Sequence, residues 1–263
     1  MSYSDLVKSN WGFISSEQQE KISQTRVLLA GCGLGSNIAV LAARTGFTKF
    51  TLADGDVVEA GNLNRQAFRT EQCGRNKAGA TAELIREINP RAEIEVFPRF
   101  ISNNNEVAEL VTGADQIVNM VDPSPVLFEI NRLAAEQDKP SYFPLNIGFG
   151  TAVFVFTKNS YTLEQMLPSG HATGTSQFFF SLVMQMSDRL PGYLQDHAGV
   201  IQKVMNENLS IPQLGIAAGL NASLTVTAML KYAAGIPVPV APDVINLDTW
   251  AVTSSDVKHI SKK

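Results

Sequence analysis

The sequence contains very little cysteine. Of its 263 residues only two are cysteine, Cys32 and Cys73, and they do not form a CxxC pair. This spacing argues against a disulfide framework and against a four-thiolate zinc site, so we expect no structural zinc. The second half of the sequence has no cysteine at all, which excludes a thioester-forming or sulfur-relaying cysteine there.

The sequence also lacks a long apolar run and an excess of basic residues. No stretch approaches the roughly 20 apolar residues that cross a bilayer, and the N-terminus MSYSDLVKSNWGF has neither the charged nor the apolar region of a signal peptide. We therefore expect a cytoplasmic protein with no membrane partner. The formal net charge of −4 makes a nucleic-acid partner unexpected, unless a local basic patch binds it.

What the sequence does contain is a clear βαβ pattern near its start. The segment Arg26–Ala30 is short, apolar and followed by Gly31, which predicts a buried parallel strand. Apolar residues then recur at helical spacing over residues 34–45, and Gly46 predicts the end of that helix. The apolar run Lys49–Ala53 predicts the next strand. This unit places a glycine-rich turn at the carboxyl edge of a parallel sheet.

The alternation of strand and helix continues through the first half of the chain. We predict strands at residues 93–98, 116–120, 141–147 and 151–156, and helices at residues 76–88, 106–111 and 126–137. This order predicts an α/β fold, a Rossmann-like doubly wound and mostly parallel sheet. The 44% of hydrophobic residues is enough for the core of one large domain.

The composition changes after residue 157. Residues 158–210 are rich in methionine and phenylalanine and include a glycine-containing loop around His171, so we expect a helical insertion that forms a lid. The alternative is that these apolar residues bury a dimer interface. Residues 211–263, with a predicted helix at 216–234 and a strand at 244–247, are expected to complete the same domain as residues 1–157.

The glycine-rich turn reads Gly31-Cys32-Gly33-Leu34-Gly35. A turn between a strand and a helix presents backbone N–H groups and the positive end of the helix dipole, which suits phosphate. Because the turn nearly matches the dinucleotide fingerprint, it does not distinguish NAD from ATP. Asp54 follows the second strand and would bond ribose hydroxyls in either case.

The polar block that follows favours ATP. It contains Asp56 and the string Asn62-Leu63-Asn64-Arg65-Gln66, and Lys77 comes shortly afterwards. Attack at the α-phosphorus of ATP requires cations on the triphosphate and a neutralised pyrophosphate leaving group. A nicotinamide enzyme would have little use for this much cationic and amide functionality beside the ribose.

Together these segments resemble the adenylation domain of the ThiF/MoeB/HesA family, relatives of the ubiquitin-activating enzymes, in a zinc-free form. The resemblance covers residues 8–157 and more weakly residues 211–250, and it implies that residues 1–157 form the ATP-binding adenylation core. It is carried by the glycine-rich turn, the acidic pair Asp54 and Asp56, residues 62–66 and 74–77, Ile88-Asn89-Pro90 and Asp122. It implies ATP-dependent adenylation of a carboxylate on a protein, peptide or RNA-linked acceptor, by a homodimer.

The resemblance also implies roles for individual residues. Asp54 would bind the ribose hydroxyls, and Arg65 and Lys77 the phosphates, where they would take part in catalysis. Asp122 would hold magnesium at the reacting α-phosphate. The implied nucleotide-binding residues are Gly31, Gly33, Gly35, Asp54, Asp56, Asn62, Arg65, Gln66 and Lys77.

This sequence departs from the family pattern at three places. The turn is one residue shorter than the usual GxGGxG, Asp122 is followed by Pro123 where Asp-Asn is common, and Ser9 stands where relatives carry an arginine that reaches the triphosphate of a partner subunit. Two alternatives remain open. The shortened turn and the missing arginine are compatible with a nucleotide-binding pseudoenzyme or scaffold of the same fold. The near match to the dinucleotide fingerprint is compatible with an NAD(P)-dependent oxidoreductase.

Overall fold

The computed structural model describes residues 2–167, 175–184, 198–207 and 211–251. The described residues form one sheet of seven strands in the order β3-β2-β1-β4-β5-β6-β7. The strands β1 to β5 pair in parallel, and β5, β6 and β7 pair antiparallel. The strands are β1 (Arg26–Ala30), β2 (Lys49–Ala53), β3 (Glu93–Phe97), β4 (Gln116–Asn119), β5 (Ser141–Ile147), β6 (Gly150–Phe156) and β7 (Val244–Asp248).

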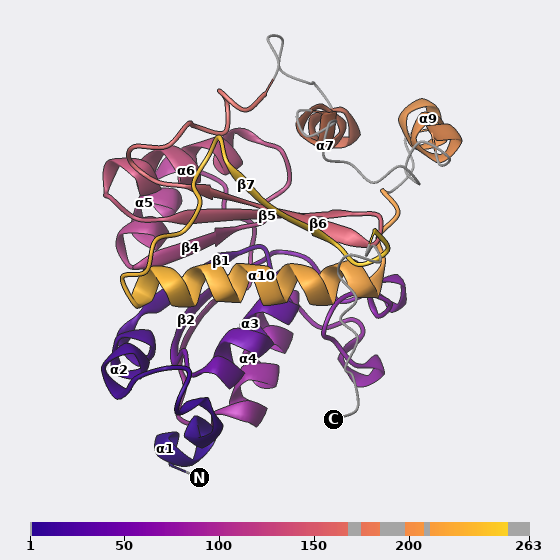
Figure 1. The fold of residues 1–263 in the computed structure, drawn as a ribbon. Helices are drawn as coiled ribbons and strands as arrows, with labels where there is room; N and C mark the ends of the chain where they lie inside the picture. The colour runs from indigo at the N-terminus through magenta and orange to yellow at the C-terminus, as the bar shows by residue number, and fades with distance from the viewer. Residues whose placement is uncertain (1, 168–174, 185–197, 208–210, 252–263) are drawn as a thin grey trace, which may run out of the picture.

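Helices cover both faces of this sheet (Figure 1). On one face, α3 (Gly35–Thr45), α4 (Lys77–Ile88) and α10 (Gly215–Ala233) pack on buried residues of the central strands, and α10 lies across the sheet beside α3. On the other face, α5 (Asn104–Thr112) and α6 (Pro125–Glu136) pack on β1 and β4. The prediction of a doubly wound, mostly parallel α/β sheet is confirmed.

The predicted helical insertion is present between β6 and α10. Its described helices are α7 (Thr175–Met184) and α9 (Ala198–Glu207). Phe178 and Leu182 of α7 are buried against the α6 face of β5 and β6, in a cluster with Phe143 and Phe154. The glycine-containing loop around His171, on which the expectation of a lid depends, lies outside the described residues.

The N-terminal segment packs at the far end of α3 from the glycine-rich turn. It contains α1 (Tyr3–Leu6), a 3-10 turn at Lys8–Asn10 and α2 (Ser16–Gln24). The Asn10 amide donates to the carbonyl of Thr45, the last residue of α3, at 3.0 Å. Beyond it, Trp11 and Phe13 are 81% and 95% exposed.

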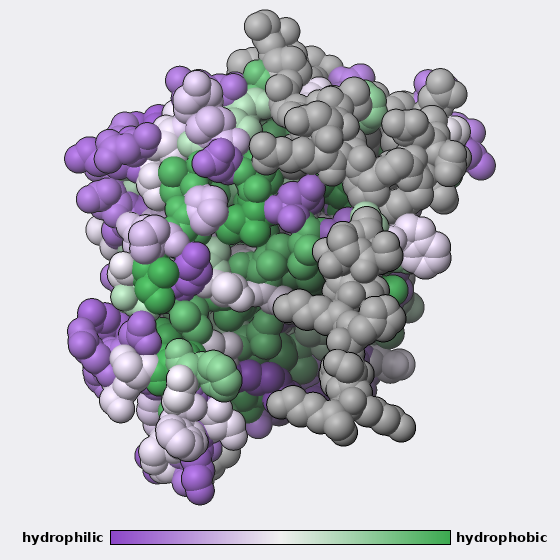
Figure 2. Space-filling model, in the orientation of Figure 1, coloured by the Kyte–Doolittle hydropathy of each residue, from purple (hydrophilic) through white to green (hydrophobic). Residues whose placement is uncertain are grey.

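A second group of exposed apolar residues lies on the α10 side of the molecule. Hydrophobic residues gather across the middle of this face, and hydrophilic residues gather along its left border (Figure 2). The exposed large side chains of α10, of the segment after it and of β7 include Ile216, Tyr232, Ile236 and Leu247. None of the described helices combines the length and the apolar character that crossing a lipid bilayer requires.

Candidate functional site

A cavity of about 940 Å³ opens at the carboxyl ends of β1, β2 and β4. The strand order reverses direction between β1 and β4, which is where doubly wound sheets bind ligands. Eight of the ten residues that the sequence assigned to the site line this cavity, and we call them the polar half. They are Gly31, Gly33, Asp54, Asp56, Arg65, Gln66, Lys77 and Asp122.

The glycine-rich turn depends on glycine at its first position. Gly31 has φ +98°, and a Cβ there would lie 2.6 Å from the carbonyl oxygen of Met120, which follows β4. The turn therefore lets β1 and β4 approach closely at the cavity. The helix α3 begins directly after it, and Leu34 at the N-cap makes no side-chain capping bond. An uncapped helix N-terminus beside a cavity is suited to an anion.

Two of the expected residues lie outside the cavity lining. Gly35 is buried at the start of α3, where a Cβ would make only ordinary van der Waals contacts with Leu29 and Met120, so the packing there does not require glycine. Asn62 stabilises its own turn, because its side-chain oxygen accepts from the backbone N–H of Glu59 at 3.0 Å. The structure thus differs from the expectation that Asn62 lines the pocket.

Ser36 and Asn37 of α3 connect the glycine-rich turn to the polar loop. The Ser36 hydroxyl donates to the Gly33 carbonyl at 2.7 Å and accepts from the Ala67 N–H at 3.0 Å. The Asn37 amide donates to the Arg65 carbonyl at 2.7 Å. These bonds hold the backbone of residues 65–67 against the turn. The sequence pattern did not predict this role, because Ser36 and Asn37 reach backbone groups 31 and 28 residues away.

Asp54 is fixed beside the turn by two backbone groups. Its carboxylate accepts from the N–H of Cys32 at 2.7 Å and from the N–H of Asp56 at 2.8 Å. Burial raises the pKa of Asp54 above its ordinary value, although both hydrogen bonds act in the opposite direction. Burial also raises the pKa of the Cys32 thiol, which is fully enclosed, so Cys32 is a small core residue in the turn.

The two cations of the polar half are held in different ways. The Lys77 Nζ lies 2.9 Å from an Asp56 carboxylate oxygen, and the lysine side chain is only 11% exposed. Arg65 donates through one terminal nitrogen to the Gly61 carbonyl and the Asn64 side chain. Its Nε is buried and has no hydrogen-bond partner in the described part of the chain. Both cations line the cavity, within reach of a bound anion.

Asp122 lies in the loop between β4 and α6 and is exposed. Asn119, fully buried at the end of β4, holds this loop by donating to the Leu127 carbonyl at 2.9 Å. Among the described residues there is no cluster of three or more His, Cys, Asp or Glu that could bind a metal by themselves. A magnesium ion is nevertheless commonly bound by one or two carboxylates with substrate phosphates and water, so the single carboxylate of Asp122 fits it.

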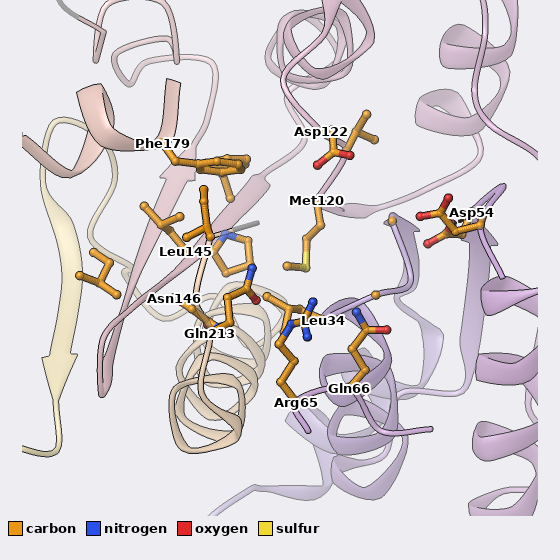
Figure 3. Close-up of a pocket in the computed structure, with 18 of the residues that line it drawn as sticks. Leu34, Asp54, Arg65, Gln66, Met120, Asp122, Leu145, Asn146, Phe179 and Gln213 are labelled. Carbon is orange, nitrogen blue, oxygen red and sulfur yellow. Dashed lines mark hydrogen bonds between the residues drawn. The ribbon is translucent and has the colours of Figure 1, made fainter. Parts of the chain in front are cut away.

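The other end of the cavity is apolar, and most of its side chains come from the insertion that we expected to form a lid. β5, α7 and α9 contribute them, and we call them the apolar half. They are Phe143, Leu145, Phe179, Phe180, Val183, Val200 and Val204. Figure 3 shows Phe179 on one side of the cavity and Arg65 and Gln66 on the other.

Two amide side chains lie between the halves. Asn146 is near the end of β5, Gln213 precedes α10, and both line the cavity (Figure 3). The Asn146 oxygen accepts from Asn221 of α10 at 2.9 Å. The Asn146 Nδ2 and the Gln213 Oε1 are buried and have no partner among the described residues. The sequence contained no signal for either residue, because their contacts span 75 and 149 residues of chain.

Comparison with protein families gives a match to the ThiF family over residues 4–263. The adenylyltransferase and sulfurtransferase UBA4 of Candida albicans is 32% identical over 121 residues, which are 45% of this chain and 27% of that protein. The sulfur carrier protein ThiS adenylyltransferase of Escherichia coli is 28% identical over 146 residues, 55% of this chain and 58% of that protein. The chain therefore matches between about a quarter and three fifths of the length of these relatives.

Solved structures share the fold over most of the chain. A crystal structure of E. coli MccB with ATP covers 90% of this chain, with a TM-score of 0.66 and 17% identity, and the match covers 64% of that chain. A crystal structure of PaaA covers 90% of this chain, with a TM-score of 0.65 and 20% identity, and again 64% of that chain is matched. At this level of identity the similarity shows the fold alone.

Proposed function

The chain belongs to the ThiF family, and we propose that it adenylates a carboxylate of a protein or peptide acceptor with ATP. The observation that carries the proposal is a single cavity with two unlike halves. Its polar half has the cations and backbone donors that a triphosphate needs, and its apolar half gives room for a second substrate beside it. Its volume lies near the upper end of the usual range for ligand sites.

In this reaction a carboxylate oxygen of the acceptor attacks the α-phosphorus of ATP. The bond from the α-phosphorus to the bridging oxygen breaks, and pyrophosphate leaves with the bonding electrons. Arg65 and Lys77 neutralise the charge that builds up on the triphosphate and the leaving group. Asp54 binds the ribose hydroxyls as an acceptor. Asp122 would hold magnesium, which would supply further positive charge at the reacting phosphate.

Isotope exchange between pyrophosphate and ATP, in the presence of an acceptor, tests this proposal. Asp122→Asn should bind ATP but fail to exchange pyrophosphate, because charge at the α-phosphorus develops mainly in the transition state. Asp243→Asn is the matched control, since Asp243 is exposed and does not line the cavity. Full exchange in Asp122→Asn would show that this role is misplaced.

Binding measurements separate the proposal from its alternatives. A ligand that binds only the folded state raises thermal stability, so ATP with magnesium should raise the Tm and NAD should not. The reverse result would favour an oxidoreductase. Binding of ATP without exchange for any acceptor would favour a pseudoenzyme, in line with the shortened turn.

We also propose that the protein acts as a homodimer. Trp11 and Phe13 are exposed close together in the sequence, and further exposed apolar residues gather on the α10 side; such groups of apolar residues are typical of interaction surfaces. Lys8 and Ser9 lie at the end of α3 away from their own turn, so they could contribute only to the site of a partner subunit. Sedimentation velocity tests the proposal, and a monomer at micromolar concentration would contradict it.

The absence of zinc and a cytoplasmic location stay predictions.

A further inference from the structure

The apolar half of the cavity contains no group that would assist the phosphate chemistry. Phe143 is almost fully buried and stacks on Phe179, with ring centroids 6.3 Å apart and planes at 8°. Phe178 packs edge-on against Phe143 from behind. Val183 of α7 and Val204 of α9 extend this wall. The wall is therefore a packed aromatic and aliphatic surface that faces a cavity, where an apolar group of a ligand would be removed from water.

None of the described residues that form this wall carries a charge. The cations that line the cavity are Arg65, Lys77 and Arg99 among the described residues. Arg65 and Lys77 belong to the polar half, and Arg99 bonds to Glu106 beside β3. A charged or strongly polar acceptor side chain would lose its hydration against the wall without gaining a partner, which is costly.

Each of the two amides at the boundary has one buried atom without a partner among the described residues, a donor on Asn146 and an acceptor on Gln213. Asn221 is 1% exposed, and its side-chain amide donates to the side-chain oxygen of Asn146. The Asn146 Nδ2 is a donor with no partner in the described part of the chain. The Gln213 Oε1 is an unpaired acceptor. Leaving such buried groups without partners is unfavourable, so a ligand that supplies both partners gains from doing so. A peptide group has one C=O and one N–H and therefore matches this pair.

We infer that the acceptor is a peptide whose reacting carboxylate belongs to a residue with a bulky apolar side chain or lies directly beside one. The apolar side chain packs on Phe179, Val183 and Val204, and the adjoining peptide group bonds to Asn146 and Gln213. The carboxylate then points from this boundary toward the polar half. This inference rests on the proposed function, and it disfavours an acceptor that ends in consecutive glycines, because glycine would leave the wall uncovered.

Binding of short synthetic probes to the unmodified protein tests the inference. The probes are N-acetyl-Ala-Phe, N-acetyl-Ala-Leu and N-acetyl-Ala-Gly with free carboxylates, together with an N-acetyl-Ala-Phe analogue in which an ester replaces the peptide link. Calorimetry is done with an ATP analogue that has a methylene α,β-bridge, so that no reaction consumes the probe. We expect the Phe and Leu probes to bind at least about tenfold more tightly than the Gly probe. The ester should bind severalfold more weakly than its amide, because it has no N–H for Gln213.

Two variants locate the effect. Phe179→Ala should reduce the preference for Phe over Gly to about twofold or less while leaving the affinity for the ATP analogue unchanged. Tyr161→Ala is the matched control, because Tyr161 is an exposed aromatic residue outside the cavity, and it should keep the full preference. Asn146→Leu should bind the amide and the ester more weakly to a similar extent, since both retain the carbonyl that accepts from Asn146.

Each possible outcome bears on either the acceptor site or the proposed adenylation. Equal binding of the Phe and Gly probes, or no binding of any probe, would overturn the inference. Equal binding of the amide and ester probes would show that Gln213 does not accept a hydrogen bond from the peptide N–H. If the preference for apolar probes holds but no probe supports pyrophosphate exchange, the acceptor site stands and the proposed adenylation fails. If exchange occurs only with glycine-ended acceptors, the adenylation stands and this inference fails.

Discussion

The polar half of the cavity takes its residues from segments that directly follow β1, β2 and β4, whereas the apolar half takes its residues from β5, α7 and α9. In the polar half, backbone groups do much of the positioning: Gly31 adopts a left-handed conformation, and two backbone N–H groups fix Asp54. In the apolar half, residues are positioned by side-chain packing between segments that are distant in the sequence. In the proposed reaction, local conformation would therefore position the groups that bind ATP, and tertiary packing would determine the choice of acceptor.

Among the variants that test this contrast, we expect replacement of Gly31 to have the largest effect, which is on the free energy of unfolding. Gly31→Ala should destabilise the fold by about 3 kcal/mol, because the positive φ costs about 1–2 kcal/mol and crowding against a backbone carbonyl adds to it. Gly74→Ala is the control: φ is +83° there too, but a new Cβ would meet nothing within 4 Å. It should cost only the conformational part, about 1 kcal/mol. Urea denaturation measures both, and equal losses would mean that the contact with Met120 is unimportant.

The next effect concerns the cations of the polar half. Lys77→Ala and Arg65→Ala should each weaken ATP binding by about 1.5–3 kcal/mol if each cation makes a charge-assisted bond to phosphate. Arg75→Ala is the matched control, because Arg75 is exposed, pairs with Glu83 and does not line the cavity. Calorimetry with ATP and magnesium measures the difference. Unchanged affinity in both cavity variants would refute their assignment.

A smaller effect is expected in the packing behind the apolar half. Phe178→Leu removes the edge-on ring contacts with Phe128 and Phe143, and should lower the free energy of unfolding by about 1 kcal/mol. ATP affinity should stay within about twofold, because distant sites behave independently. A large loss of ATP affinity in this variant would show that the two halves are coupled and would break the contrast.

The smallest expected effect is a pH dependence of stability and of ATP affinity that arises from Asp54. Burial raises the pKa of its carboxyl, so the folded state binds its proton more tightly than the unfolded chain does. Stability therefore falls as the pH rises from the ordinary aspartate pKa through the raised one. Protonation also removes an acceptor for the ribose hydroxyls, so ATP affinity should fall as the pH drops through the same window. Asp54→Asn should lack both steps when unfolding and ATP binding are titrated beside the unmodified protein.

Much of the polar half could be predicted from the sequence because its signals are local. The predicted bounds of β1 and β2 agree with the structure, since short apolar runs ended by glycine or aspartate leave little freedom. The position of Asn62, outside the cavity lining, also has a local cause. An asparagine three residues after Glu59 can satisfy the backbone of its own turn, and that bond took precedence over facing the cavity.

The boundary and the apolar half could not be predicted in the same way. Asn146 is one asparagine near the end of an apolar strand, and its importance comes from Asn221, 75 residues later. Phe179 belongs to a run of three phenylalanines in which only the fold decides that Phe178 is buried and Phe179 lines the cavity. Helical periodicity indicates which residues share a face, but not what that face will meet.

The helix α10 makes the boundary sensitive to register. Asn221 lies six residues after Gly215, the first residue of the helix, and Gly215 packs so closely on the Asn64 carbonyl that a Cβ would lie 2.5 Å from it. Each added or removed residue between them would turn Asn221 by roughly 100° about the helix axis. The amide of Asn146 would then lose the bond that orients it. Substitutions along this stretch can therefore alter the acceptor site gradually, whereas a single insertion or deletion would disconnect it in one step.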